Sequence, residues 1–149
     1  MKRKNNRGFT LIEILIVISL IAILATVVLV AINPGRQFAQ ARNSQRLSNI
    51  NSILNAINQN MADNKGIFKC ASVATLPAAA TNIESAGADL RSCIVPTYLG
   101  ELPIDPSTGL FTSASDYSTK YSISQDATTK RITIEALDAE LSEKISVTR

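Results

Sequence analysis

The chain has 149 residues, with 15 Lys plus Arg, 12 Asp plus Glu and no histidine, and its formal net charge is +3. Without histidine, a catalytic triad or dyad built on an imidazole base and a histidine metal cluster are both excluded. The glycines form no phosphate-binding loop, and the acidic residues are scattered along the chain. We therefore predict that the protein is not an enzyme.

The start of the chain is its most informative segment. Four basic residues within residues 1–7 precede the string Gly-Phe-Thr-Leu-Ile-Glu at residues 8–13, and an apolar run without charged residues then continues to Ile32. As a helix, residues 9–32 would span about 36 Å, which is enough to cross a bilayer with some tilt. A cleavable secretory signal has a shorter apolar part, of about 7–15 residues. A plain signal anchor fits the length, and a carboxylate at headgroup depth, favoured by the helix dipole, is tolerable at Glu13. Neither interpretation, however, predicts the Gly-Phe-Thr-Leu-Ile-Glu string.

This string resembles the N-terminus of type IV pilins and of the pseudopilins of type II secretion. The resemblance implies that a prepilin peptidase removes residues 1–8 as a leader by cutting between Gly8 and Phe9, and that Phe9 is then N-methylated. It also implies that Glu13 pairs with the N-terminal amine of a neighbouring subunit during assembly, which is a partner that a buried carboxylate requires. The expected partners are the peptidase, further copies of the chain, other pilins, membrane lipid and an inner-membrane assembly platform.

Cleavage would change the charge argument. Removing residues 1–8 takes away four of the 15 basic side chains, and 11 remain against 12 acidic ones. Basic flanks stay on the cytoplasmic side of a membrane, so we expect a single-pass protein of the cytoplasmic membrane with an exported C-terminal part, which then enters a surface or periplasmic filament. The overall basicity therefore does not indicate nucleic-acid binding. A DNA-binding competence pilin remains an alternative through its local positive charges, which are Arg36, Arg42, Arg46, Lys130 and Arg131.

Residues 33–61 are predicted to continue the helix in amphipathic form. Asn33-Pro34-Gly35 predicts a kink or local break at the membrane exit. Beyond it, apolar residues recur at three- and four-residue steps and predict one core-facing stripe. The stripe consists of Leu47, Ile50, Ile53, Leu54, Ile57 and Met61. Polar residues from Asn43 to Asn58 are expected to form much of the remaining helix surface. Arg36, Arg42 and Arg46 near its start are expected to be solvated, with contacts to lipid headgroups or to acidic residues of neighbouring subunits as alternatives.

Residues 62–149 are predicted to form a small globular head. Within it, residues 64–100 are rich in Ala, Ser, Thr and Asn and predict a variable loop, with a short helical turn near residues 86–91. In an oxidising compartment, Cys70 and Cys93 are most simply one disulfide, worth roughly 3 kcal/mol. Two free thiols or a metal pair are the alternatives, but the chain has no CxxC motif.

A Leu-Pro-Ile-Asp-Pro segment at residues 102–106 precedes an oxygen-rich loop. It resembles an element of major pseudopilins, in which a nearby loop can hold calcium. Asp105 and Asp116 are the candidate carboxylate ligands here, whereas Ca²⁺ takes about six to eight oxygens. Turn formation explains the same residues equally well, so no cofactor is expected unless calcium binds.

The C-terminal third predicts a β-hairpin at about residues 119–136. Polar and apolar residues alternate on both sides of a polar turn at residues 125–130, which places Tyr121, Ile123, Ile132 and Ile134 on one face. Residues 137–145 fit either a short helix or a loose tail. The predicted fold is α+β, with a long N-terminal helix packed on a small antiparallel sheet. The function expected from the resemblance is a structural subunit of a type IV pilus-like filament, with a major pseudopilin or a non-polymerising membrane-anchored domain as alternatives.

Overall fold

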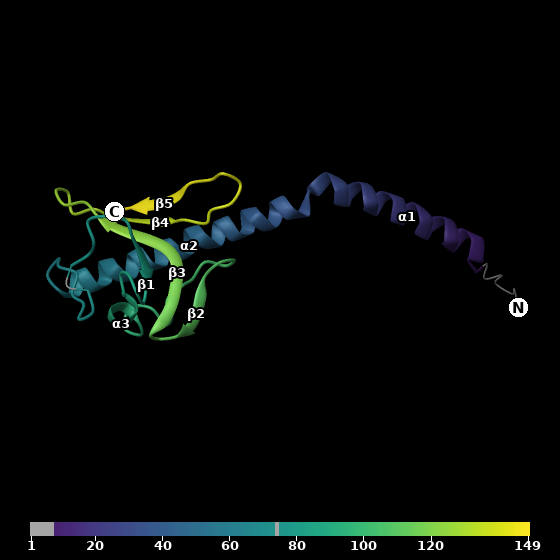
Figure 1. Cartoon of the computed structure of the whole chain (residues 1–149). Coiled ribbons are helices and arrows are strands. Elements are labelled where there is room, and N and C mark those ends of the chain that lie inside the picture. The colour runs from purple at the N-terminus through teal and green to yellow at the C-terminus, as the bar shows by residue number, and fades with distance from the viewer. Residues whose placement is uncertain (1–7, 74) are drawn as a thin grey trace, which may run out of the picture. The chain divides into compact units, whose positions relative to one another are not determined.

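The structure is a computed structural model that describes residues 8–73 and 75–149 (Figure 1). It divides into two compact units, one up to Gln37 and one from Phe38 to Arg149. The first helix, α1, runs from Leu11 to Ile32, and the second, α2, from Pro34 to Asp63. All strands and the short helix α3 follow α2 in the chain, so the head belongs to the second unit.

The predicted break lies at Asn33, the single residue between the two helices. Asn33 has a left-handed backbone, with φ of 48°. Pro34 is the first residue of α2, where the missing N–H of proline costs no helical hydrogen bond. The Asn33 side chain then accepts a hydrogen bond from the Arg36 N–H at 3.3 Å. The same residue therefore ends α1 and caps the start of α2.

The core-facing stripe of α2 is confirmed for most of its predicted members. Ile50, Ile53, Leu54 and Ile57 are fully buried, and Met61 packs against the core while half-buried. Leu47 was predicted to be buried but is 46% exposed. The stripe instead continues backwards through Arg46, Asn43 and Ala39, all of which are buried. The expectation that Asn43 and Arg46 lie on the solvated surface is therefore wrong.

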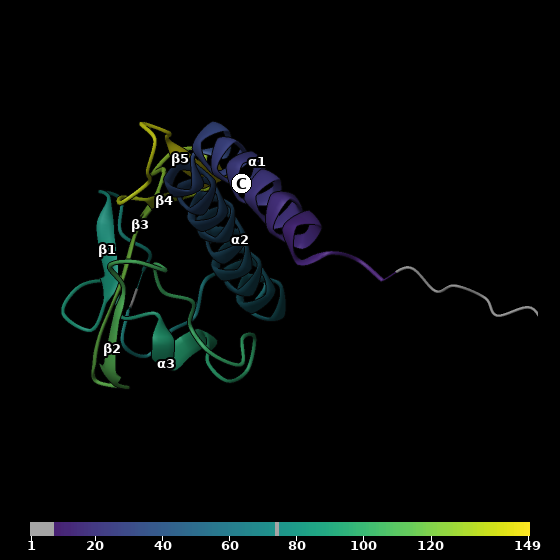
Figure 2. The ribbon, with the colours of Figure 1, turned by 90° about the vertical axis from the view of Figure 1, so that its right-hand side faces the viewer.

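The head is built on a five-stranded antiparallel sheet. Its strands are β1 (Thr81–Glu84), β2 (Leu110–Ser113), β3 (Asp116–Gln125), β4 (Ile132–Ala136) and β5 (Ile145–Thr148). The order is β1-β3-β4-β5, and β2 also pairs with β3. The sheet lies beside α2, and the apolar side chains of both form one core (Figure 2). This arrangement is the predicted α+β fold.

The predicted hairpin is confirmed as β3 and β4. Tyr121 pairs with Ala136 and Ile123 with Ile134, and Tyr121, Ile123, Ile132 and Ile134 are all buried, as expected. Three strands were not predicted. β1 lies within the segment expected to be a loop, β2 within the oxygen-rich loop, and β5 follows a stretch of turns where a helix or a tail was expected. The helical turn expected near residues 86–91 is found later, as α3 from Arg91 to Ile94.

A bulge bends β3 in its middle. Asn82 of β1 pairs with Ser122, but Glu84, two residues on, pairs with Ser118. The additional residues of β3 include Lys120, which has a positive φ of 62°. The bend lets the first part of β3 pair with β2 and the last part with β4. It also leaves the Thr119 carbonyl to accept the Asp105 N–H at 3.0 Å, which anchors the segment before β2.

Candidate functional site

The entrance of α1 is closed by a capping box. Thr10 has an extended backbone, and its hydroxyl accepts the Glu13 N–H at 3.3 Å. In return, the Glu13 carboxylate accepts the Thr10 N–H at 3.5 Å, which is a long hydrogen bond. This reciprocal arrangement satisfies two N–H groups at the helix start, and a negative charge there is favoured by the helix dipole. Glu13 therefore has a local role that the sequence reasoning did not assign to it.

The predicted cleavage site lies just ahead of this cap. Gly8 and Phe9 are not helical, and the Phe9 side chain is 80% exposed. A Cβ added at Gly8 would meet nothing within 4 Å, so the packing of the chain itself does not require glycine at this position. An exposed, non-helical peptide bond is what a peptidase needs, because the scissile bond must enter its active site. The rest of the predicted leader, residues 1–7, lies outside the described residues.

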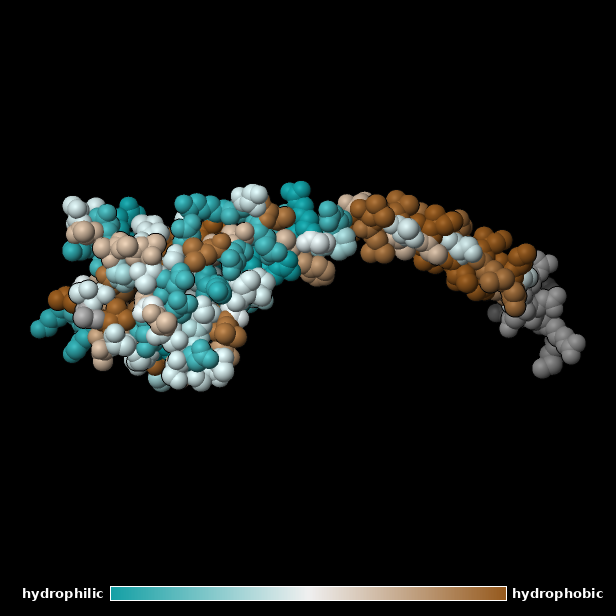
Figure 3. Space-filling view, in the orientation of Figure 1, coloured by the Kyte–Doolittle hydropathy of each residue, from teal (hydrophilic) through white to brown (hydrophobic). Residues whose placement is uncertain are grey.

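α1 is almost entirely apolar, as the brown face in Figure 3 shows, and none of its residues is buried within the described part of the chain. Its two hydroxyl groups are satisfied inside the helix, since Ser19 donates to the Leu15 carbonyl at 2.7 Å and Thr26 to the Ala22 carbonyl at 2.9 Å. Satisfying polar groups internally is the condition for a segment in lipid. Among the described residues, α1 is the one helix long and apolar enough to cross a membrane.

A buried ion pair joins Arg46 of α2 to Asp105 of the head. Both side chains are completely buried, and two nitrogens of the guanidinium contact the two carboxylate oxygens at 2.6 and 3.2 Å. Arg46 also donates to Asn43 and Glu140, each at 2.9 Å. The expectation that Arg46 is solvated is therefore wrong. Arg46 ties α2 to the segment before β2 and to the connection between β4 and β5.

Burial raises the pKa of Asp105, but hydrogen bonds outweigh this effect and hold its pKa well below the ordinary value. They come from Arg46, from the backbone N–H groups of Ser107 and Thr108, and from the Ser107 hydroxyl. The guanidinium is therefore the cation that faces this predicted calcium ligand. Asp116, the other candidate, lies exposed at the start of β3. The described residues contain no group of three or more His, Cys, Asp or Glu that could hold a metal ion, and calcium binding stays a prediction.

Two of the four arginines proposed for DNA contact, Arg42 and Arg46, are engaged within the chain, whereas Arg36 and Arg131 are exposed. Arg42 binds Glu140 through two nitrogens, each at 2.6 Å, and Arg46 is buried. Together the two arginines lower the pKa of Glu140 to about 2, with the hydrogen bond from Arg42 as the largest cause. Lys130 and Arg131 are exposed at the turn between β3 and β4. Positive charge available to a ligand is thus found at the hairpin turn rather than along the middle of α2.

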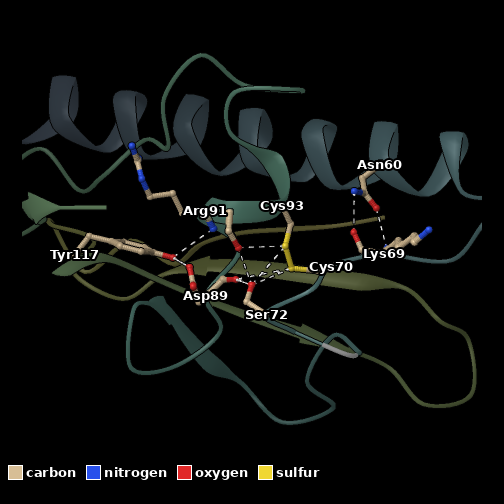
Figure 4. The surroundings of a disulfide bond; sticks show 9 residues. Asn60, Lys69, Cys70, Ser72, Asp89, Arg91, Cys93 and Tyr117 are labelled. Atoms are coloured by element: carbon tan, nitrogen blue, oxygen red, sulfur yellow. Dashed lines mark hydrogen bonds between the residues drawn. A yellow bond between two sulfur atoms is a disulfide. The ribbon is translucent and has the colours of Figure 1, made fainter. Parts of the chain in front are cut away.

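The disulfide between Cys70 and Cys93 is present, with its Cα atoms 5.2 Å apart (Figure 4). It joins the loop after α2 to α3. The same loop is fixed to α2 by Asn60, whose side-chain amide donates to the Lys69 carbonyl at 3.1 Å and accepts the Lys69 N–H at 2.9 Å (Figure 4). The loop that was predicted to be variable is therefore fixed to α2 next to Cys70 and to α3 through the disulfide.

A second polar cluster near the disulfide was not predicted from the sequence. The Tyr117 hydroxyl donates to the Asp89 carboxylate at 2.7 Å and accepts the Arg91 N–H at 3.3 Å (Figure 4). Burial, followed by the bond to Asp89, raises the pKa of Tyr117. Arg91 in turn lies over the ring of Phe111, with its guanidinium carbon 4.8 Å from the ring centre. These contacts fix α3 to the sheet.

Comparisons with known proteins identify the N-terminal segment. Residues 3–29 match the family model of the prokaryotic N-terminal methylation motif. The searches of curated proteins and of solved structures found no match. The matched residues include the Gly8–Phe9 bond, the capping box and most of α1. The chain thus carries the prokaryotic N-terminal methylation motif, the prepilin-type signature of type IV pilins and pseudopilins.

Proposed function

We propose that the protein is a structural subunit of a type IV pilus-like filament. In this proposal it is held in the cytoplasmic membrane by α1, cut by a prepilin peptidase between Gly8 and Phe9, methylated at Phe9 and polymerised through α1. The observation that carries the proposal is the surface of α1, which is apolar all round and uncovered within the chain. Such a surface requires lipid or other apolar helices around it, and a filament core of parallel helices supplies the second.

Glu13 is the residue assigned to assembly. A carboxylate that moves from the membrane interface into a bundle of apolar helices requires an opposite charge and hydrogen bonds. Among the described residues of its own chain, its carboxylate has only the long contact to the Thr10 N–H, at 3.5 Å. The amine of Phe9 in a neighbouring copy supplies the missing positive charge once the leader has been removed. The proposed pairing therefore makes assembly depend on prior cleavage.

Two substitutions in the capping box, one at Glu13 and one at Thr10, separate capping from ionic pairing. Glu13→Gln retains a side chain that can close a capping box but removes the charge, whereas Thr10→Val removes the hydroxyl cap and keeps the charge. We expect Glu13→Gln to enter the membrane and to be cleaved but to form few filaments, as Glu13→Ala would. Thr10→Val should assemble nearly normally. Filaments from Glu13→Gln in normal number, imaged on cells that carry the assembly machinery, would refute the ionic role.

A major pseudopilin is the second candidate function. The segment at residues 102–106 supports it, because this segment resembles the pseudopilin element and is built into the head: Leu102 is 4% exposed and Asp105 is 2% exposed. The two functions predict different defects in cells from which the gene for this chain has been deleted. Loss of protein secretion with surface filaments unchanged would identify a pseudopilin, and loss of surface filaments with secretion unchanged would identify a pilus subunit.

A further inference from the structure

One end of the head gathers positive charge around an exposed apolar side chain. Lys65 and Lys69 line a cavity of about 430 Å³ behind the end of α2. Lys130, from the turn between β3 and β4, lines a neighbouring cavity of about 250 Å³. Both cavities are also lined by Ile67, which is 70% exposed. Lys65, Ile67, Lys69 and Lys130 are called the basic end below.

The lysines of the basic end have no carboxylate within ion-pair distance in the described part of the chain. Of the acidic residues near them in sequence, Asp63 lines the first cavity and Asp126 lies in the hairpin turn, and neither forms an ion pair with these lysines. Asp63 accepts a hydrogen bond from the Tyr98 hydroxyl at 3.0 Å. Asp126 accepts the N–H groups of Thr128 and Thr129 within its own turn. The basic end therefore presents cationic groups to solvent together with an apolar side chain.

The connection between β4 and β5 has the opposite character. Asp138 and Glu143 are exposed, and in the described residues neither contacts a cationic side chain. Asp138 accepts the Thr108 hydroxyl at 2.5 Å and Glu143 the Asn43 amide at 2.9 Å. Two leucines of the same connection are also exposed, Leu137 by 51% and Leu141 by 43%. Leu137, Asp138, Leu141 and Glu143 are called the acidic end.

These two surfaces lie at opposite ends of the head. The acidic end contacts α2 at Asn43, and the basic end begins directly after α2 stops at Asp63. Twenty residues of helix separate these points by about 30 Å. The sheet gives the same result. The turn before β4 carries Lys130 and the connection after β4 carries the acidic end, and these two segments lie at opposite ends of the strand, as Figure 1 shows. The basic and acidic ends of one molecule therefore cannot reach each other.

We propose that the basic end of one copy docks on the acidic end of the next copy. The inference rests on the proposed function and names the head surfaces that meet in the filament. The two surfaces carry opposite charges, and both offer exposed aliphatic groups to be covered, Ile67 on the basic end and Leu137 and Leu141 on the acidic end. Because they are different surfaces at opposite ends of one head, their contact is heterologous, and a heterologous contact that does not close into a ring propagates as a filament. Charged groups at such a contact mainly select the partner and its register.

Zero-length cross-linking tests the contact directly. Isolated filaments of the full processed chain are treated with a carbodiimide, which joins a lysine amine to a carboxylate only where the two touch, and are then analysed by mass spectrometry. We expect Lys65, Lys69 or Lys130 to be joined to Asp138 or Glu143. The distance of about 30 Å within one molecule means that these products come from two copies. Filaments that yield other cross-links but none of these would overturn the proposal.

Charge reversal tests it independently. The variants Lys69→Glu/Lys130→Glu and Asp138→Lys/Glu143→Lys should each raise the subunit level needed for filaments by about tenfold, because like charges would then face each other. The combination of all four substitutions restores opposite charges and should restore filaments. Thr112→Lys, which adds a charge to the exposed strand β2, is the control and should have little effect. The amounts of cleaved, disulfide-bonded subunit in the membrane show that the variants fold.

The outcomes separate this contact from the proposed function. If the unaltered chain and both double variants form filaments equally, the contact is wrong and the function stands. If filaments are unaffected and the basic-end variant instead loses retention of duplex DNA at low salt, the basic end serves nucleic acid and the contact is wrong. If the unaltered chain forms no filaments with its assembly machinery, the proposed function and this contact fall together.

Discussion

Replacing Arg46 by methionine should cost the head a large part of its stability. The substitution keeps an unbranched side chain of similar reach but leaves Asp105 as a buried carboxylate without its cation, since the side chains of both residues are 0% exposed. Breaking a buried ion pair in this way typically costs about 3–5 kcal/mol, whereas the unfolding free energy of a whole domain is only about 5–15 kcal/mol. The Ser107 and Thr108 N–H groups still bind the carboxylate and keep the expected loss toward the lower value.

The measurement is proteolysis of the head across a urea series, with the full chain in detergent micelles. Arg42→Ala is the matched control, because Arg42 also binds Glu140 but its side chain is 36% exposed, and such a pair is worth less than about 1 kcal/mol. Adding Asp105→Asn to Arg46→Met should recover part of the loss, since asparagine keeps an acceptor for the Ser107 and Thr108 N–H groups without a charge. An Arg46→Met loss as small as that of Arg42→Ala would refute the reasoning.

Three further predictions concern the same head. The folded state lowers the pKa of Asp105 and takes the pKa of Glu140 from 4.5 to about 2, so the unfolded chain binds more protons in acid. The urea midpoint of unfolding should therefore be constant above about pH 5 and fall between about pH 5 and pH 2. A midpoint that stays constant down to pH 2 would contradict this prediction. Reducing the Cys70–Cys93 disulfide should lower the unfolding free energy by about 3 kcal/mol, and Cys70→Ser/Cys93→Ser should match the reduced protein and be insensitive to reductant. Gly109→Ala should lower the unfolding free energy by about 1–3 kcal/mol in the urea series, because its Cβ would lie 2.6 Å from the Asp105 carbonyl oxygen. Gly100→Ala is the control and should have little effect, because a Cβ added there has nothing within 4 Å.

The sequence predicts the elements whose residues repeat with a clear period. The middle of α2 and the hairpin of β3 and β4 follow from apolar spacing, since a buried face leaves that period in the sequence. α1 buries no face and follows instead from the length of its continuous apolar run. β2 has no buried residue, and therefore no alternation that could reveal it. β5 is four residues long, and β1, which lies in an Ala- and Ser-rich segment, has Ile83 as its single buried residue. Such strands are specified by their pairing with β3 and β4 rather than by their own composition.

Arg46 shows how a polar residue in the core escapes pattern reasoning. It lies four residues before Ile50, on the same face as the buried isoleucines, so the helical period itself places it toward the core. Its charge nevertheless favoured a solvated position, because lone arginines are rarely buried. The missing information was its partner, since Asp105 lies 59 positions further along the chain. A charged residue on an apolar stripe is therefore a signal to search for a distant residue of opposite sign.

Glu13 joins the local structure to the proposed processing. In the uncut chain, its carboxylate faces the Thr10 N–H of its own helix at 3.5 Å, and the next residue back is Phe9. Cleavage after Gly8 would convert the Phe9 nitrogen from an amide, which carries no charge, into an amine with an ordinary pKa near 8. That charge would arise just ahead of the helix that Glu13 caps. A neighbouring copy in the membrane would then meet a helix end that carries both a cation and an anion, and two such ends can pair in register. Cleavage would thus create the complementary charge as well as free the chain, which explains why the proposed assembly requires the leader to be removed first.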